Sequence, residues 1–260
     1  MEFINQVLKI WREYAPALWD GTITTVTIAI IGTLVGLGIG LIIGIYKTIP
    51  INPNDNVVKR IGYKIVDFIL SAYIEIIRST PMMVQAMLFY YGIAMVFNVQ
   101  LNILVSGLII VSVNTGAYMS EIVRGGIISI DHGQYEAAHS IGMTHGQTMT
   151  KIVLPQAIRN IMPSIGNEFI INMKDSCVLS VIGVTELFYV SKYAAGATFH
   201  YFETFSITLI YYFILCFTTT KILRYIEKRM DGPDSYTIMG SQTAPEAVIH
   251  VNTASHGKGE

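Results

Sequence analysis

Residues Glu136 to Ala157 read EAAHSIGMTHGQTMTKIVLPQA, a polar stretch of helix-forming residues between long apolar runs. Asp131, with Gln134 three residues later, is typical of a helix N-cap. Gly142 is suited to end that helix, and Leu154-Pro155 is expected to break a second helical run. A membrane helix hairpin needs no such insert in order to fold, so we expect a water-soluble partner to bind it. The alternative is a capped hairpin that only satisfies its own backbone.

The composition indicates that the apolar runs are membrane spans. Of the 260 residues, 52% are hydrophobic and only 13% are charged, whereas an average soluble domain carries about 25% charged residues. The uncharged residues occur in blocks such as 21–46 and 79–120, and blocks of that length cross a bilayer as helices. The net charge of −1 gives no reason to expect a nucleic-acid partner. We therefore expect an all-α integral membrane protein.

About five transmembrane helices are predicted within a membrane domain that covers residues 21–230. The spans are expected at about residues 22–46, 82–97, 102–120, 161–184 and 204–220, with a polar loop over residues 121–160. Residues 57–79 carry too many charges for a lipid-exposed span and are expected to form a helix at the interface or packed on others. Asn98, Gln100 and Asn102 mark a tight turn between the second and third spans.

The first span carries a stripe of small residues. Gly32, Gly36, Gly40 and Gly44 recur at every fourth position. Such a stripe lets another helix backbone approach closely, which favours contact where lipid supplies no hydrophobic drive. The stripe serves either packing within this chain or an interface with a second subunit.

The two ends of the chain differ from the membrane domain. Residues 1–20 suggest a short amphipathic helix outside the cytoplasm, with Trp11, Tyr14 and Trp19 at the membrane interface. Residues 231–260 are polar, and we expect a disordered cytoplasmic tail.

Basic residues predict the orientation in the membrane. Five spans place residues 47–80, 121–160 and the tail on one side, and these regions hold thirteen lysines and arginines. The other side holds Lys9, Arg12 and Lys192. Under the positive-inside rule the N-terminus lies outside, and the polar loop and the C-terminus face the cytoplasm.

No catalytic signature is present in the sequence. The motifs HExxH, GxSxG and GxxxxGK[ST] are all missing, so we do not expect an enzyme. The spacing of His132, His139 and His145 matches no helical metal pair, and no metal site is expected. A transporter built on this chain therefore takes its energy from an ion gradient or from another subunit.

Two carboxylates in the fourth span are the main candidates for a substrate path. Glu168 and Asp175 are seven residues apart, so they share one helix face at about 10 Å along the axis. Charged residues within a span are functional candidates, because they are costly to bury in lipid. One carboxylate can hold an α-ammonium group and the other a polar or cationic side chain. The alternatives are an ion pair with Lys174 or a place at the water interface.

Gln85, Asn114 and Tyr118 are weaker candidates for the same path. A buried asparagine or glutamine in a span also serves to hydrogen-bond a neighbouring helix.

The polar loop resembles a known signature. The loop contains Glu136-Ala137-Ala138, then three residues, Gly142, nine residues, Ile152, one residue and Leu154-Pro155. This order and spacing are similar to the cytoplasmic EAA motif of ATP-binding-cassette (ABC) importer permeases. From about residue 20 to 230 the chain resembles the polar amino-acid branch, of the histidine/glutamine permease type. Supporting segments include Arg78–Pro81, Gly116–Tyr118, Arg124–Ile127, Asn167–Ile170 and Lys174–Ser176. Two departures are Ser79, where glycine is usual, and Cys177, where serine or threonine is common.

This resemblance implies a type I importer permease fold and a set of partners. The coupling residues that contact a cytoplasmic ABC ATPase dimer would be Glu136, Ala137, Ala138, Gly142, Leu154 and Pro155. The ATPase would bind ATP and Mg²⁺, and this chain would carry no cofactor. A second permease subunit, identical or related, and an extracytoplasmic substrate-binding protein would complete an importer in the bacterial cell membrane. The positions of Glu168 and Asp175 match ones that line the amino-acid pocket in family members.

The resulting hypothesis is a permease subunit that imports glutamine, glutamate or a basic amino acid by alternating access. The alternative is a secondary transporter, driven by an ion gradient, that uses Glu168 or Asp175 as a proton carrier. An intramembrane enzyme is the third class, and no nucleophile–base pair can be named for it.

Overall fold

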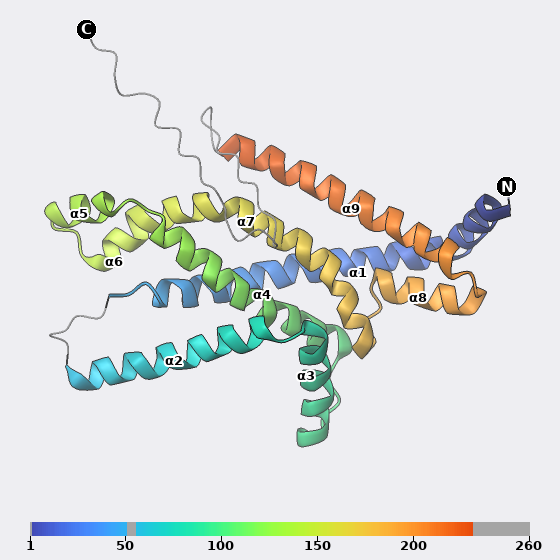
Figure 1. The fold of residues 1–260 in the computed structure, drawn as a ribbon, viewed down its shortest axis with the longest axis horizontal. Helices are drawn as coiled ribbons and strands as arrows, with labels where there is room; N and C mark the ends of the chain where they lie inside the picture. Colours follow the sequence, from blue (N-terminus) through green and yellow to red (C-terminus); the bar gives the residue numbers. More distant parts are fainter. Residues whose placement is uncertain (1, 51–55, 231–260) are drawn as a thin grey trace, which may run out of the picture.

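The computed structural model describes residues 2–50 and 56–230, and every regular element in these ranges is helical (Figure 1). The predicted tail, residues 231–260, lies outside them. Five long helices run roughly along the long axis of the molecule, and α3 crosses that direction. The long helices are α1 (Glu2–Tyr46), α2 (Val57–Ser79), α4 (Ile103–Ile128), α7 (Leu154–Asp175) and α9 (Tyr201–Met230), and α3 is Met82–Phe97.

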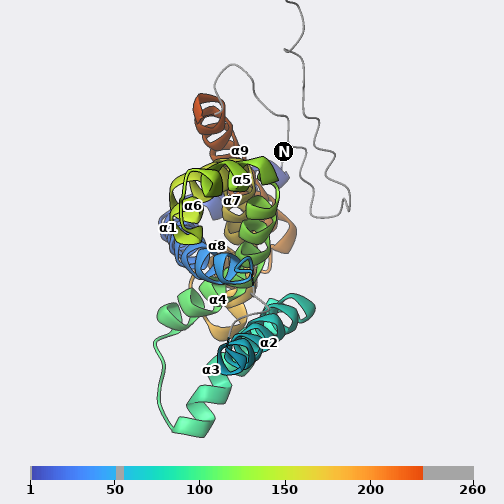
Figure 2. The ribbon, with the colours of Figure 1, turned by 90° about the vertical axis from the view of Figure 1, so that its left-hand side faces the viewer.

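The short helices gather at the two ends of this bundle. At one end α5 (His132–Ser140) and α6 (His145–Thr148) lie near the end of α1 and the start of α2 (Figure 1). At the other end are the N-terminus, α8 (Leu187–Thr198) and the start of α9. Viewed along the axis, α2 and α3 lie on one side of the group formed by α1, α4 and α7 (Figure 2).

The helices fit the predicted number of spans. In the described ranges α1, α4 and α9 each have the length and composition of a membrane span. Two pairs of helical segments have the length and composition of a span only when each pair is taken together. They are α2 with α3, bent by 112°, and residues 145–182 with α8, bent by 55°. The count is three, or up to five if each pair is one span. The segment 82–97, predicted as a span by itself, is α3, which passes this test only together with α2.

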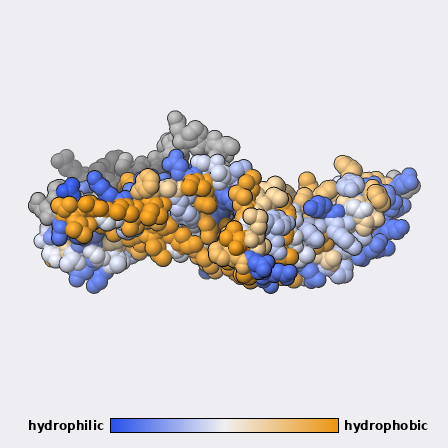
Figure 3. All heavy atoms as spheres, turned by 90° about the horizontal axis from the view of Figure 1, so that it is seen from below, coloured by the Kyte–Doolittle hydropathy of each residue, from blue (hydrophilic) through white to orange (hydrophobic). Residues whose placement is uncertain are grey.

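The outer face of α2 is largely apolar. Val58 is 75% exposed and Phe68 is 73% exposed, and hydrophobic side chains cover much of the surface seen from this side (Figure 3). Such an area is suited to contact with lipid or with a second subunit.

Helix α1 is longer than predicted. Residues 2–46 form one helix, so the separate amphipathic helix expected over 1–20 is instead its first part. The reason lies in its packing partners, since Ile10 and Leu18 are buried against Leu187 of α8 and Ile207 of α9. Tertiary packing of an apolar face stabilises a helix beyond its intrinsic propensity.

The glycine stripe of α1 packs inside the chain, against α4. A methyl group added at any of the four glycines would overlap a side chain of α4. The facing residues also recur every fourth position: Gly32 meets Val111, Gly36 meets Thr115, Gly40 meets Met119 and Gly44 meets Val123. Of the two roles considered for the stripe, the structure therefore assigns it packing within the chain.

A buried hydrogen-bonded node adds α7 to this pair. Asn172 Nδ2 donates to Thr33 Oγ1 at 2.9 Å, and Thr115 Oγ1 donates to Asn172 Oδ1 at 3.0 Å. All three side chains are at most 5% exposed, so each bond satisfies a group that water does not reach. The node joins one residue from each of α1, α4 and α7.

The close contact of α1 and α4 predicts a position-specific effect of bulk. We expect Gly40→Leu to lower the free energy of unfolding by roughly 1–3 kcal/mol or more, because overpacking forces the helices apart. The measurement is thermal unfolding of the purified protein in detergent. Gly38→Leu is the matched control, because no atom lies within 4 Å of a Cβ added there. Equal losses in the two variants would contradict the assigned packing.

Candidate functional site

Helix α5 begins and ends where the sequence predicts. Asp131 Oδ1 accepts a hydrogen bond from Gly133 N at 2.7 Å, as an N-cap does. Gly142 follows the helix with φ +80°, and Met143 N donates to Ala138 O at 3.1 Å. Glycine is the residue that adopts this left-handed conformation without strain, so Gly142 terminates α5.

The second helical run starts with a capping box. Thr144 Oγ1 accepts from Gln147 N at 3.3 Å, and Thr144 N donates to Gln147 Oε1 at 2.9 Å. The two residues thus satisfy each other's backbone donors at the start of α6.

The predicted break at Leu154-Pro155 is wrong. Helical structure continues through α6, a π-helix over Met149–Val153, and α7. A proline in a helix has no N–H and its ring clashes with the carbonyl four residues earlier. Here a π turn precedes Pro155, with Leu154 N bonded to Met149 O, and Pro155 lies in the first turn of α7. The wider turn accommodates the proline without ending the helix.

One side of this segment is seated on the bundle. Met149 and Val153 of the π-helix pack with Val123, Ile127 and Ile161 of α4 and α7 in one apolar cluster. Ala138 of α5 is also buried, and Tyr135 packs against the cluster, where burial raises the pKa of its hydroxyl. The segment is therefore held firmly by the helices that follow and precede it.

The other side of the segment is open. Glu136, Ala137 and Pro155 are exposed, Leu154 is half-buried, and no atom lies within 4 Å of a Cβ added at Gly142. Ile141 is 76% exposed and is not among the coupling residues predicted from the sequence. Its apolar character beside the terminating glycine was the available signal. An exposed apolar residue at a helix end, on a rigid base, suits a protein-docking surface.

The two carboxylates of α7 are both unpaired. Glu168 is 6% exposed, and Asp175 lies at the end of the helix and is exposed. Neither forms a hydrogen bond or an ion pair with a described residue, so the alternative pairing with Lys174 is not made. No fully buried side-chain oxygen of the described residues lacks a hydrogen-bond partner, so the oxygens of Glu168 keep some access to solvent. Ionisable groups within a span are candidates for ligand binding.

Gln85 and Asn114 are brought together, and they hold the bend between α2 and α3. Asn114 Nδ2 donates to Gln85 Oε1 at 3.1 Å. Gln85 Nε2 donates to Ile77 O at 2.8 Å and to Thr80 O at 3.0 Å, at the end of α2. These bonds correspond to the structural alternative considered for a polar residue in a span.

Tyr118 lies elsewhere, in a cavity between α2 and α4. This α2–α4 cavity has a volume of about 570 Å³ and is lined by Lys47, Ser71, Ile74, Glu75, Arg78, Ser79, Tyr118 and Glu121. The guanidinium of Arg78 lies over the Tyr118 ring, 5.6 Å from its centre. The five predicted path residues thus divide between the α7 carboxylates, the α3–α4 amide pair and this cavity.

Glu186 has a structural role that was not predicted from the sequence. It is fully buried and caps α8, accepting from Phe188 N at 2.8 Å and Tyr189 N at 2.7 Å. Tyr212 of α9 also donates to it at 3.2 Å. An acidic residue directly before an apolar helix was the signal that an N-cap occurs here.

The chain is similar to one protein family and to several curated proteins, and these are all transport proteins. Residues 60–232 match the family described as "Binding-protein-dependent transport system inner membrane component". The chain is 33% identical over 222 residues to the glutamine transport system permease protein GlnP of Escherichia coli K12, covering 85% of this chain and 95% of that protein. It is 32% identical over 219 residues to the arginine transport system permease protein ArtQ of Bacillus subtilis, covering 84% and 94%.

Solved structures agree with these relatives. A crystal structure described as an amino acid ABC transporter with histidines has 36% sequence identity and a TM-score of 0.74, over 88% of this chain and 99% of that one. An inward-facing MetNI methionine ABC transporter has 20% identity and a TM-score of 0.64, which supports the fold alone. With a family match over most of its length and relatives aligned nearly end to end, the chain belongs to the family of inner membrane components of binding-protein-dependent transport systems.

Proposed function

We propose that this chain is the membrane-spanning permease subunit of an ATP-driven importer of a polar amino acid in the bacterial cell membrane. The α5–α6 segment, residues 131–148, carries the proposal. It offers an exposed glycine and an exposed isoleucine at a helix end, on a base packed against α4 and α7. The relatives named as glutamine and arginine permeases support an amino acid as substrate.

The coupling would be mechanical. A cytoplasmic ATPase docked on α5 binds ATP and Mg²⁺, and closure of the ATPase dimer displaces the segment. Because helical structure continues from α6 through the π-helix into α7, that displacement reaches the helix that carries Glu168. Rigid-body motion of this kind requires no reactive group in the segment itself. Two permease subunits moving together would alternate between outward-open and inward-open states.

The proposed orientation places this segment on the cytoplasmic side. The α5–α6 segment and the basic end of α9, with Lys221, Arg224, Lys228 and Arg229, belong to the side that the positive-inside rule assigns to the cytoplasm. The extracytoplasmic binding protein would then deliver its ligand at the end where the N-terminus and α8 lie (Figure 1).

The α7 carboxylates suit the substrate's positive groups. Glu168, which is buried and has no protein partner, is suited to attract an α-ammonium group. Asp175 lies further along the same face of the helix and is suited to attract a polar or cationic side chain. Glutamine, glutamate and basic amino acids all offer the ammonium group.

The first prediction concerns docking. We expect Ile141→Ser and Gly142→Leu each to lower ATP-dependent uptake at least about tenfold, a loss of about 1.4 kcal/mol in coupling. The measurements are uptake into proteoliposomes holding all subunits and co-purification of the ATPase. Ile141→Ser introduces no backbone strain, so it separates docking from the strain expected at φ +80° in Gly142→Leu.

Tyr193→Ser is the matched control for docking, because Tyr193 is 67% exposed but belongs to α8 at the opposite end. It should keep the ATPase bound. Full uptake and ATPase retention in both segment variants would contradict docking at α5.

The second prediction separates the two energy sources. We expect no uptake by the chain without its ATPase, and uptake that persists with an uncoupler at constant ATP. Glu168→Gln should weaken uptake at least about tenfold without lowering the unfolding temperature, since the carboxylate that it removes has no protein partner and costs stability where it lies. Glu13→Gln, an exposed carboxylate of α1, is the control. Uptake by the chain alone that an uncoupler abolishes would support a proton carrier instead.

A further inference from the structure

The α2–α4 cavity has no role in the mechanism above. Its volume of about 570 Å³ lies in the range of small-molecule sites, about 300–1,000 Å³. Four of its lining side chains are charged: Lys47, Glu75, Arg78 and Glu121. A cavity that presents both signs of charge binds a ligand that also carries both.

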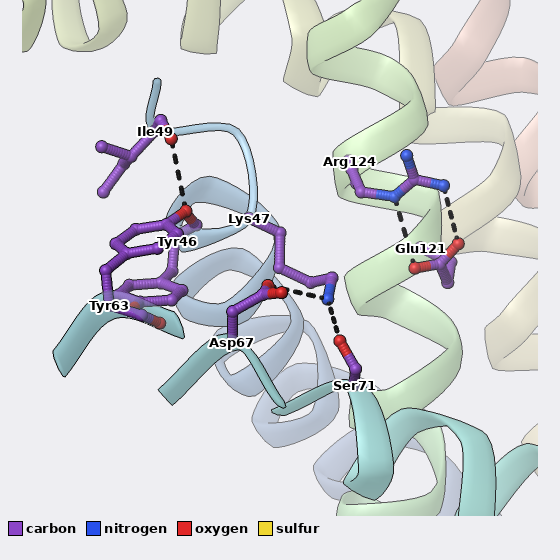
Figure 4. Close-up of polar contacts among 8 residues, drawn as sticks. All are labelled: Tyr46, Lys47, Ile49, Tyr63, Asp67, Ser71, Glu121 and Arg124. Atoms are coloured by element: carbon purple, nitrogen blue, oxygen red, sulfur yellow. Dashed lines mark hydrogen bonds and ion pairs between the residues drawn. The ribbon is translucent and has the colours of Figure 1, made fainter. Parts of the chain in front are cut away.

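Two of these charges are already neutralised by protein groups. Lys47 Nζ lies 3.1 Å from Asp67 Oδ1 and donates to Ser71 Oγ at 2.6 Å (Figure 4). Glu121 accepts two hydrogen bonds from Arg124, at 3.3 and 3.0 Å (Figure 4). These pairs, with the stacked rings of Tyr46 and Tyr63 nearby, make a firm wall rather than a binding group.

The remaining two charges have no directly bonded partner among the described residues, although Arg78 interacts electrostatically with Glu121. Glu75 and Arg78 are three residues apart on α2, and both are exposed. Neither forms a hydrogen bond or an ion pair with a described residue. The contact of Arg78 is with the face of Tyr118, which orients the guanidinium without neutralising it. The cavity lining therefore includes one carboxylate and one guanidinium that no described residue bonds directly.

This pair matches the zwitterion of a free amino acid. A guanidinium binds a carboxylate through two parallel hydrogen bonds, and a carboxylate accepts from an ammonium group. The hydroxyls of Ser71 and Ser79 in the same lining are suited to a polar side chain. An ethanolamine phospholipid headgroup has the same combination of ammonium and anion, so it is the other source of this chemistry.

The two charged groups lie part-way along the bundle. Glu75 and Arg78 are in the last two turns of α2, at the end that joins α3, and Arg78 contacts Tyr118 of α4. We propose that the α2–α4 cavity is a second amino-acid site, separate from the α7 carboxylates, where Arg78 and Glu75 bind the zwitterion. This inference rests on the proposed function.

The test is equilibrium binding of labelled glutamine and labelled arginine to the permease–ATPase complex, without the substrate-binding protein, in phosphatidylglycerol nanodiscs. We expect two binding steps for the amino acid that is transported. Glu168→Gln removes one step, whereas Arg78→Gln and Glu75→Gln each weaken the other at least about tenfold. Lys64→Gln, which removes an exposed cation of α2 outside the cavity lining, leaves both steps unchanged.

Three results would overturn the assignment. A single binding step that Glu168→Gln abolishes would leave the proposed function intact and remove the second site. Loss of the second step on adding phosphatidylethanolamine would give the cavity to a lipid headgroup. No binding of any amino acid by the wild-type transporter would contradict the proposed function itself. The unfolding temperatures of all variants are compared with that of the wild type. If Arg78→Gln fails to fold, Glu75→Gln alone tests the second site.

Discussion

The close approach of α1 and α4 is the constraint on which the other contacts depend. Four glycines at every fourth position of α1 allow Val111, Thr115, Met119 and Val123 of α4 to lie against its backbone. In lipid, where apolar side chains gain little by leaving their surroundings, such fit supplies much of the attraction between helices. The same approach places Thr33 and Thr115 where Asn172 bonds both, so α7 takes its position from this pair.

Helix α7 links the proposed docking segment to the proposed substrate carboxylates. Its N-terminal side continues the α5–α6 segment through a π turn, and its C-terminal side carries Glu168 and Asp175. A turn over residues 141–144 joins α5 to α6, and helical structure is continuous from α6 onward. Both α5 and the π-helix also pack against the apolar cluster of α4 and α7, so the segment is held by packing as well as by the chain. The exposed side of the segment has shape and apolar character but no reactive group, which is appropriate for transmitting force.

The polar groups of the helices fall into two kinds. Asn172, Glu186 and the Gln85–Asn114 pair are satisfied by neighbours and hold helices or a bend in place. Glu168, Glu75 and Arg78 form no hydrogen bond or ion pair with the described residues. Residue type alone does not separate these kinds, because a glutamate serves as a buried cap at one position and as a free carboxylate at another.

Local patterns in the sequence determined the helical membrane class, the cap at Asp131, the end of α5 at Gly142 and the α3–α4 turn, since each depends on residues within a few positions. The tertiary structure decided what depends on distant partners. Packing on α8 and α9 makes residues 2–20 the first part of α1, and a π turn lets helical structure continue across Pro155. It also decided that the glycine stripe faces α4, and that Tyr118 joins Arg78 rather than Asn114. Burial and hydrogen bonding are set by which helices meet, and spacing along one chain does not specify that.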